Sequence, residues 1–194
     1  MNFLAHLYLS QNNTEIMIGN LIADHIRGNK FSHFSEAIQQ GILLHRKIDS
    51  FTDTHAIVKQ SKRRLHERYG HFDGVIIDVF YDYFLAKNWH LYSQIPLDVY
   101  AHAVYTLLQK HYDILPVKTQ HILPYMIDYN WLYNYQFKEG IAKVLVGLNN
   151  RTKGISKMDL AIEDLNIHHH ALEEDFSLFF KDLMHMTATE LKRL

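Results

Sequence analysis

The chain has 194 residues, enough for one well-buried core, and no shift in composition divides it, so we expect a single domain over residues 1–194. Hydrophobic residues make up 47% and charged residues 21%, with a formal net charge of -1, a balance that argues against a disordered chain or a strongly basic nucleic-acid-binding protein. The absence of cysteine excludes disulfides, thiolate nucleophiles and sulfur-ligated metal sites.

The N-terminal stretch MNFLAHLYLSQNN has no basic region, and His6 interrupts its apolar run, so it does not resemble a secretory signal. No apolar stretch in the chain reaches the roughly 20 residues that are needed to cross a bilayer. We therefore expect a cytoplasmic protein without membrane insertion.

The remaining chain has the pattern of an all-α fold, a single-domain helical bundle, because apolar residues recur at helical spacing and proline is rare. Ser35 is a candidate N-cap, Gly28 and Gly70 are candidate helix ends, and Pro124 is expected to kink or break its helix. In chain order, the predicted helices are Glu15–Arg27, Ser35–Ser50, Thr54–Tyr69, Phe72–Trp89, Leu97–His111, Val117–Trp131, Leu132–Leu148 and Asp159–Leu194, with a polar loop at Asn149–Lys157.

The most apolar of these helices carries two carboxylates. In GVIIDVFYDYFLA, Asp78 and Asp82 lie four residues apart and so project from one face of the helix. Two buried like charges one turn apart need cations, and a divalent metal supplies them. The alternative is a thin stripe of solvated acids. The sequence alone leaves both interpretations open.

The same spacing recurs in GILLHRKIDSFTD, where His45, Asp49 and Asp53 follow one another at intervals of four. An imidazole and carboxylates on one helix face are a typical arrangement of metal ligands. A surface ion pair, or a hydrogen bond that orients the histidine, is the simpler alternative.

A third instance lies in IMIGNLIADHIRG, where Asn20 and Asp24 are four apart and Gly19 allows another helix to approach closely. Asp24 has an alternative as a helix-end acid paired with Arg27. His6 lies between apolar residues in FLAHLYL, where a hydrogen-bonded core histidine is the simpler interpretation.

Three apolar segments that carry oxygen and nitrogen ligands at one-turn spacing are most simply explained by a shared metal site. Its predicted ligands are Asp24, His45, Asp49, Asp78 and Asp82. Carboxylate-rich sets suit hard divalent cations, so we expect Mn²⁺ or Mg²⁺. Such a cation activates water and binds phosphoryl oxygens, which predicts phosphoester or phosphodiester hydrolysis. No nucleophilic-serine motif or Gly-rich phosphate loop competes with this prediction.

Basic residues follow the proposed ligands. Arg46 is a candidate for holding a phosphate through paired hydrogen bonds and for neutralising charge that develops on it. The segment KQSKRRLHERYG adds a local basic patch, which is either a solvated helix face or a surface that attracts an acidic substrate or partner. The patch contains Lys59, Lys62, Arg63, Arg64 and Arg68.

Two other clusters point to structure instead of chemistry. His168–His170 are consecutive and so point three ways around a helix, and we expect them at the surface. The aromatic run YMIDYNWLYNYQF is expected to pack into the core. A nucleic-acid stacking platform is possible there but has no support from the overall charge, so no nucleic-acid partner is predicted.

At these motifs the sequence resembles the acyl carrier protein phosphodiesterase family, which is related to the HD-domain phosphohydrolases. The likeness runs nearly end to end through MNFLAHLYLS, GNLIADHIRG, GILLHRKIDSFTD, DVFYDYFLAKNW and NWLYNY…GI, in family order. It implies an HD-domain-like fold and Mn²⁺-dependent hydrolysis of the phosphodiester that joins phosphopantetheine to a serine of acyl carrier protein. The carrier protein is acidic, so Lys59, Lys62, Arg63 and Arg64 become a predicted docking surface.

By position, the predicted metal ligands and Asp53 match the family's polar motifs, and His6 matches its N-terminal histidine. We expect His6 or Asp53 to handle a proton or to orient a ligand. Tyr8 and Tyr83 depart from the pattern, since relatives commonly have histidine there, and the adjacent His–Asp doublet of HD enzymes is absent. Two alternatives stay open, a metal phosphohydrolase for a nucleotide or other small phosphodiester and a non-catalytic helical module that binds acidic partners.

Overall fold

The computed structural model describes residues 2–11 and 13–193, and all regular structure within these ranges is helical, which confirms the predicted all-α class. In the same ranges, five short 3₁₀ helices connect the α-helices. The α-helices are α1 (Phe3–Leu9), α2 (Thr14–Ile22), α3 (Glu36–Thr54), α4 (Ala56–Tyr69), α5 (Asp73–Lys87), α6 (Leu97–Lys110), α7 (Val117–Asp128), α8 (Trp131–Asn134), α9 (Lys138–Arg151) and α10 (Ala161–Leu191).

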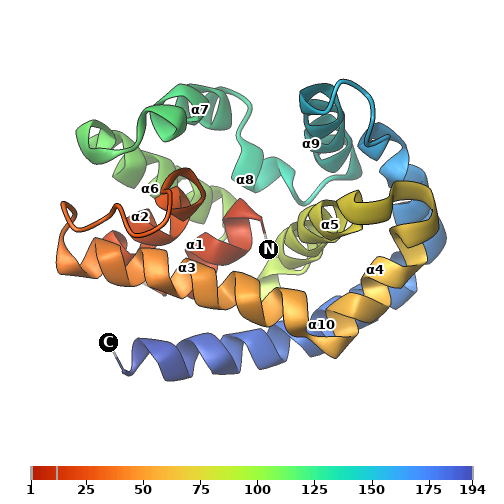
Figure 1. Ribbon diagram of the computed structural model, residues 1–194, viewed down its shortest axis with the longest axis horizontal. Helices are drawn as coiled ribbons and strands as arrows, with labels where there is room; N and C mark the ends of the chain where they lie inside the picture. The colour runs from red at the N-terminus through yellow and green to blue at the C-terminus, as the bar shows by residue number, and fades with distance from the viewer. Residues whose placement is uncertain (1, 12, 194) are drawn as a thin grey trace.

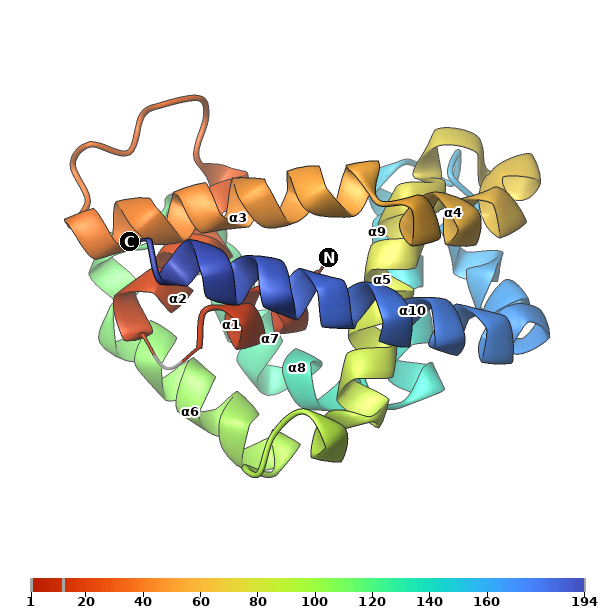
Figure 2. The ribbon, with the colours of Figure 1, turned by 90° about the horizontal axis from the view of Figure 1, so that it is seen from below.

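The helices form layers. The long helices α3 and α10 run antiparallel beside each other, and α4 continues from the end of α3 along α10 (Figures 1 and 2). Helices α1, α2 and α5 lie on this layer, and α7, α8 and α9 lie beyond them on the opposite side of the molecule (Figure 1). One continuous cluster of buried apolar side chains joins α1 to α10. The predicted HD-domain likeness stays a prediction.

Helices α2 and α3 cross at two glycines with their backbones in contact. A Cβ on Gly19 would lie 2.1 Å from the carbonyl oxygen of Ile38, and a Cβ on Gly41 would lie 2.2 Å from that of Ile16. Only glycine permits this approach, so the role predicted for Gly19 is confirmed. The crossing also places Asn20, the residue after Gly19, beside His45, one turn after Gly41.

Helix α5 passes through the core. Phe80, Tyr81, Phe84 and Leu85 are fully buried and contribute to packing on opposite sides of the helix. A helix that is apolar on nearly every side is expected to be surrounded by others, and α5 packs against α1, α4, α9 and α10. The central position predicted for this segment is confirmed.

Several predicted helix ends are confirmed. The Ser35 side chain accepts a hydrogen bond from the Ile38 N–H and so caps α3. Gly70, at φ +53°, ends α4 in a conformation that favours glycine. The His55 side chain caps α4 through the Ile57 N–H. Pro124, which is expected to kink or break its helix, lies inside α7, and α7 continues to Asp128, so the break is wrong and the kink stays a prediction.

The predicted helix Leu132–Leu148 is also wrong, because the chain turns sharply between α8 and α9. Phe137 is extended, and a Cβ on Gly140 would lie 2.0 Å from the carbonyl oxygen of Asn134, so the two helices meet at a close backbone contact. Both short helices pack apolar residues on the same core, which made their patterns look continuous. The predicted loop after α9 begins three residues later than expected, since the helix extends through Arg151.

Candidate metal centre and substrate cleft

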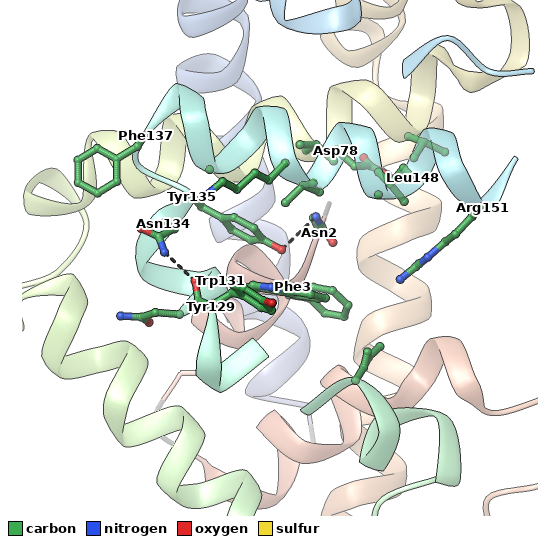
Figure 3. Close-up of a pocket in the computed structure, with 18 of the residues that line it drawn as sticks. Asn2, Phe3, Asp78, Tyr129, Trp131, Asn134, Tyr135, Phe137, Leu148 and Arg151 are labelled. Carbon is green, nitrogen blue, oxygen red and sulfur yellow. Dashed lines mark hydrogen bonds between the residues drawn. The ribbon is translucent and has the colours of Figure 1, made fainter. Parts of the chain in front are cut away.

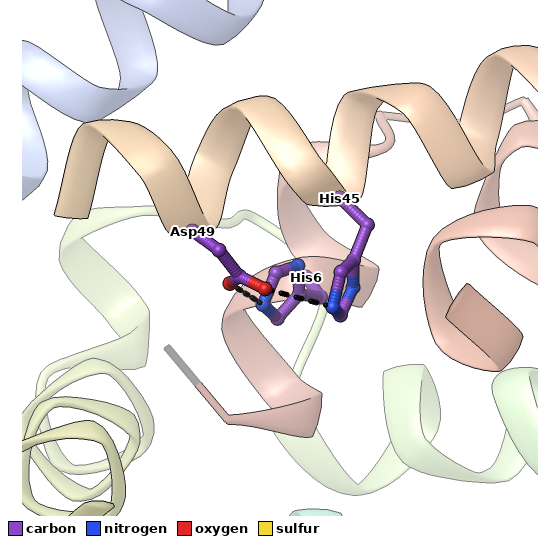
Figure 4. A group of neighbouring side chains, drawn as sticks. All are labelled: His6, His45 and Asp49. Atoms are coloured by element: carbon purple, nitrogen blue, oxygen red, sulfur yellow. Dashed lines mark ion pairs between the residues drawn. The ribbon is translucent and has the colours of Figure 1, made fainter. Parts of the chain in front are cut away.

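Four polar side chains from three helices meet beneath α3. His6 comes from α1, Asn20 from α2, and His45 and Asp49 from α3, where the one-turn spacing puts both on one face (Figure 4). The two imidazole rings stack with their centroids 4.0 Å apart. Asp49 spans them, with one oxygen 3.2 Å from His6 Nε2 and the other 3.0 Å from His45 Nε2. Asp24, in the 3₁₀ turn after α2, lies 3.2 Å from His45 Nε2.

Asn20, which is fully buried, sets the orientation of both rings. Its side-chain nitrogen donates to the His6 carbonyl oxygen at 2.8 Å and to the Ser10 hydroxyl at 2.9 Å, so its Oδ1 faces His6 Nδ1 at 2.7 Å. Its backbone oxygen lies 2.8 Å from His45 Nδ1. Because both partners are acceptors, each Nδ1 must carry the proton and donate it.

The opposite ring nitrogens, which are acceptors whenever a ring is neutral, face carboxylates. His6 Nε2 is buried and has no hydrogen-bond partner among the described residues, although Asp49 is 3.2 Å away. Lone pairs on nitrogen and oxygen that face each other need a cation between them. The ligand atoms of His6, His45 and Asp49 lie within 4.8 Å of one another, so one metal ion fits this donor set. A mixed imidazole and carboxylate set suits Mn²⁺, Fe²⁺ or Zn²⁺.

The electrostatics of the cluster agree with a site for positive charge. Burial, with a contribution from the charge of His45, lowers the pKa of His6 to about 4, so this ring is neutral. Burial opposes charge on His45 as well, but hydrogen bonds to Asp24 and Asp49 outweigh it and raise its pKa to about 9. Burial raises the pKa of Asp49. Its hydrogen bonds to His45 and His6, and the charges of these histidines, outweigh burial and hold the pKa well below the ordinary value. One positive charge thus stabilises the cluster, and a metal ion supplies at least that much.

Asp82 lies apart from this cluster and has a different task. It is fully buried, and its two oxygens accept the backbone N–H groups of Leu4, at 2.7 Å, and Ala5, at 3.2 Å. These are free N–H groups of the first turn of α1, so Asp82 caps that helix from α5. The capping fixes α1 and thereby the position of His6. The structure does not bring Asp82 together with His6 and His45.

Asp78, one turn earlier on α5, lines the cleft that is described below. Burial raises the pKa of its carboxyl group, and the charges of Asp49 and Asp53 add to this effect. Asp53 is exposed at the end of α3, one turn beyond Asp49. Asp78 thus faces the cleft, and Asp53 lies near enough for its charge to act on Asp78; the roles of both stay predictions.

Arg46 points away from the centre. Its guanidinium donates to the Gly28 carbonyl oxygen and stacks over the Phe31 ring at 5.2 Å from the ring centre. It therefore fastens the segment between α2 and α3 to α3. Nothing in this arrangement gives it contact with a phosphate, and the phosphate role stays a prediction that the geometry does not favour.

The basic patch on α4 is largely used inside the molecule. Arg64 pairs with Asp175 of α10 at 2.5 Å, and Lys62 lies 3.6 Å from Asp73. Arg68, in the same helix, binds both Glu163 and Asp164 of α10. Within the described ranges, Lys59 and Arg63 are exposed and form no ion pair, so of the predicted docking residues only these two offer unpaired charge.

A cleft of about 1100 Å³ opens beside the metal centre, between α5, α7, α8 and α9 (Figure 3). Asp24, His25 and Asp78 line it at the end near the metal centre. Aromatic and amide side chains from α1 and α8 line the rest, and α9 contributes Lys143 and Arg151. Sites for small ligands are typically apolar hollows with a few polar groups, and this cleft is at the large end of their volumes.

Two cations act on His25, at the metal-centre end of the cleft. Burial lowers the pKa of His25, and although Asp24 opposes this, the charges of Lys118 on α7 and Arg151 on α9 lower it further. Both cations are exposed and, within the part of the chain that the structure describes, form no ion pair. They leave positive charge available to an anionic ligand.

Sequence reasoning missed several residues of this site. Asn20 entered only as a possible ligand, whereas it positions both histidines. The aromatic run was assigned wholly to the core, but Tyr129 and Phe137 are exposed and Trp131 is half-buried in the cleft wall. The sequence contains one indication that α9 lines the site: Lys143 and Arg151 are eight residues apart and so lie near one helix face.

Three other predictions concern residues outside the cluster. Tyr8 donates to the Tyr92 carbonyl oxygen at 2.9 Å, and Tyr83 lies 3.1 Å from His169 Nε2. His169 is thus half-buried against α5, so its assignment to the surface is wrong, whereas His170 is exposed as predicted.

Across the described ranges, no helix combines the length and the apolar character that crossing a membrane would require.

Comparison with known proteins gives a consistent result. The model of the family described as acyl carrier protein phosphodiesterase matches residues 1–183. A protein of that name from Yersinia enterocolitica is 34% identical over 95% of this chain and 96% of its own length. Another from Salmonella agona is 33% identical over 97% of this chain and 98% of its own length. No solved structure matches the chain. A match of this extent shows that the chain belongs to the acyl carrier protein phosphodiesterase family.

Proposed function

We propose that this chain hydrolyses the phosphodiester that joins phosphopantetheine to a serine of acyl carrier protein, and that it does so with a divalent cation, Mn²⁺ or Mg²⁺. One observation carries the metal part of the proposal: Asn20 takes the Nδ1 protons of His6 and His45, so that both Nε2 atoms face the Asp49 carboxylate beside a large cleft. Membership of the family, whose relatives carry the name of this activity, supports the substrate.

The residues of the chain divide the work. His6, His45, Asp49 and Asp24 would hold the cation, which when bound polarises a phosphoryl oxygen and lowers the pKa of water. Asn20 keeps both rings in the tautomer that presents Nε2 to the metal, a task that affects metal affinity strongly in other proteins.

Hydrolysis then requires an anionic phosphate beside Asp24 and Asp49, where repulsion between like charges works against binding. The cation and the nearby guanidinium of Arg151 offset this repulsion. The leaving serine oxygen needs a proton, and Asp53, exposed one turn beyond Asp49, is the group that we propose for this step.

Binding of the carrier protein through α4 also belongs to this proposal. Lys59 and Arg63 supply its unpaired charge, since Lys62 and Arg64 already face Asp73 and Asp175. We expect the reaction in the cytoplasm and without a nucleic-acid partner.

The test is metal-dependent release of the prosthetic group. Purified protein is stripped of metal, resupplied with Mn²⁺ or Mg²⁺, and incubated with holo carrier protein, and mass spectrometry follows apo carrier protein and free phosphopantetheine. We expect release only with metal, and a loss of about 100-fold or more in His45→Ala. His170→Ala is the control, because His170 is exposed and its ion pair among the described residues is with Glu174. No release with any divalent cation would reject the substrate.

Two alternatives give different results in the same material. A phosphohydrolase for nucleotides would cleave a small phosphodiester in a substrate panel but not holo carrier protein. A non-catalytic module would contain no stoichiometric metal, which elemental analysis of the purified protein measures directly.

A further inference from the structure

The cleft is much larger than a phosphodiester requires. From the metal centre it continues past Asp78 along α8 and α9, and Figure 3 shows Arg151 and Phe137 at its opposite ends. Positions 143 and 151 alone are about 12 Å apart along α9. The space beyond the metal centre can thus hold an extended group attached to the phosphate.

The distant half of the cleft has the chemistry of a site for a chain that is partly apolar and partly amide. The rings of Phe3 and Trp131 lie 6.4 Å apart at 34° and form an apolar wall (Figure 3). Beside them, Tyr135 accepts a hydrogen bond from Asn2 at 3.4 Å. Apolar walls with a few fixed polar groups select ligands by the placement of those groups.

One residue that lines the cleft has a polar atom without a partner. Asn130 Oδ1 is buried and accepts no hydrogen bond from any residue in the ranges 2–11 and 13–193. Asn130 lines the cleft and has left-handed backbone angles, φ 42° and ψ 57°, just before α8. A buried acceptor without a donor is costly, and a non-glycine residue in this conformation adds strain. Both costs would be offset if a bound ligand donated an N–H group to this oxygen.

One of the cations that line the cleft, Arg151, lies at the end opposite Phe137. Arg151 ends α9 with its side chain directed off the helix toward the cleft, on the side of Asp78 and Leu148 (Figure 3). It lines the cleft, is exposed and forms no ion pair within the described part of the chain. A ligand with a phosphate at one end and amide groups further along would therefore meet Arg151 first and Asn130 beyond it.

We propose that the α8–α9 half of the cleft binds the prosthetic arm of the substrate, with Arg151 at its phosphate, the rings of Phe3 and Trp131 along its apolar part and Asn130 Oδ1 accepting an amide N–H. This inference rests on the proposed function. Phosphopantetheine has a phosphate, two amides and a short thiol tail, and its extended length is about that of four to five residues, roughly 15 Å. The roughly 12 Å between positions 143 and 151 of the cleft wall is comparable to most of this length.

Binding of the free arm tests the proposal without catalysis. Titration calorimetry measures the Kd of phosphopantetheine, and of pantetheine, which lacks the phosphate, for the full chain loaded with Mn²⁺. Asn130→Gly keeps the left-handed backbone and removes the acceptor, and we expect it to weaken both ligands by about three- to tenfold. Asn130→Asp keeps an oxygen and stays within about twofold of the wild type.

Two further variants separate the ends of the arm. Trp131→Ala should weaken both ligands by about tenfold or more, because a large apolar contact is lost. Arg151→Gln should weaken phosphopantetheine severalfold more than pantetheine. Tyr125→Ala is the matched aromatic control, since Tyr125 is exposed on α7 outside the cleft, and its affinities should equal those of the wild type. Thermal melts show whether each variant is folded.

The outcomes separate this inference from the proposed function. Unchanged affinities in folded Asn130→Gly and Trp131→Ala would overturn the arm site, even if holo carrier protein is hydrolysed. The expected pattern of affinities without hydrolysis of holo carrier protein would keep the arm site and reject the proposed reaction. If a nucleotide bound more tightly than phosphopantetheine and Trp131→Ala abolished that binding, the cleft would be a base-stacking site and the proposal would be overturned.

Discussion

Replacing Gly41 by alanine should disturb the metal centre without touching any of its ligands. A Cβ at this position would lie 2.2 Å from the Ile16 carbonyl oxygen and 2.9 Å from the Asn20 backbone nitrogen. Both neighbours are backbone atoms, so no side-chain rotation relieves the overlap, and α2 and α3 must separate by roughly 1 Å to restore ordinary contact. Overpacking of this kind costs about 1–3 kcal/mol, against a helix-propensity gain of at most about 1 kcal/mol.

The same displacement acts on the histidines. Asn20 holds His45 Nδ1 at 2.8 Å through its backbone oxygen, and His45 lies one turn after Gly41. Separating the helices lengthens this hydrogen bond and turns the ring away from the metal. We expect the affinity for Mn²⁺ to fall by about 10-fold or more, and the melting temperature to fall by about 2–8 °C for a chain of this length.

Urea unfolding followed by circular dichroism, together with calorimetric Mn²⁺ titration, measures both effects. Gly147→Ala on α9 is the control, because a Cβ there meets nothing within 4 Å. It should stabilise the protein by up to about 1 kcal/mol and leave Mn²⁺ affinity unchanged. If Gly41→Ala were as stable as Gly147→Ala and bound Mn²⁺ as tightly as the wild type, the backbone crossing would not position the site.

Three other substitutions test how the fold supports the site. Asn20→Leu removes three buried hydrogen bonds to His6 and Ser10, so urea unfolding should show a loss of about 3 kcal/mol, and a loss of less than about 1 kcal/mol would contradict this. Burial raises the pKa of Asp82 to about 7, so between pH 4 and pH 7 the folded state binds more protons than the unfolded state and stability falls as pH rises. Asp82→Asn should flatten this dependence of stability on pH, and an equal dependence in both proteins would refute the role of Asp82. Asp175→Ala removes the acceptor of Arg64, Ser61 and Gln60 and should lower the free energy of unfolding by about 3 kcal/mol. Glu174→Ala, at an exposed neighbour, should change it by less than about 0.5 kcal/mol, and equal melting temperatures of the two variants would contradict this.

Local patterns predicted much of the fold. Ser35 and Gly70 mark helix ends through chemistry that is visible in the sequence, and the spacing of His45 and Asp49 puts both on one face of α3. Gly19 indicated the close crossing of α2 and α3. The turn between α8 and α9 was not predictable, since Gly140 and Asn134 meet only after the chain reverses.

The candidate site was harder to predict because side chains choose partners across the fold. Asp78 and Asp82 have the same spacing as His45 and Asp49, yet Asp82 meets the first turn of α1 instead of a shared cluster. Arg64 belongs to a basic run, but its charge is taken up by Asp175 more than a hundred residues away in sequence. The periodicity of one helix shows which residues share a face, and it does not show which element that face meets.

Anomalous diffraction from crystals grown with Mn²⁺ tests the proposed metal centre most directly. A peak should lie about 2.0–2.3 Å from His6 Nε2, His45 Nε2 and an Asp49 oxygen, at the edge of the cleft. A peak bound by Asp78 and Asp82 with His6 Nε2 outside the coordination sphere, or no peak in a protein that hydrolyses holo carrier protein, would contradict the account.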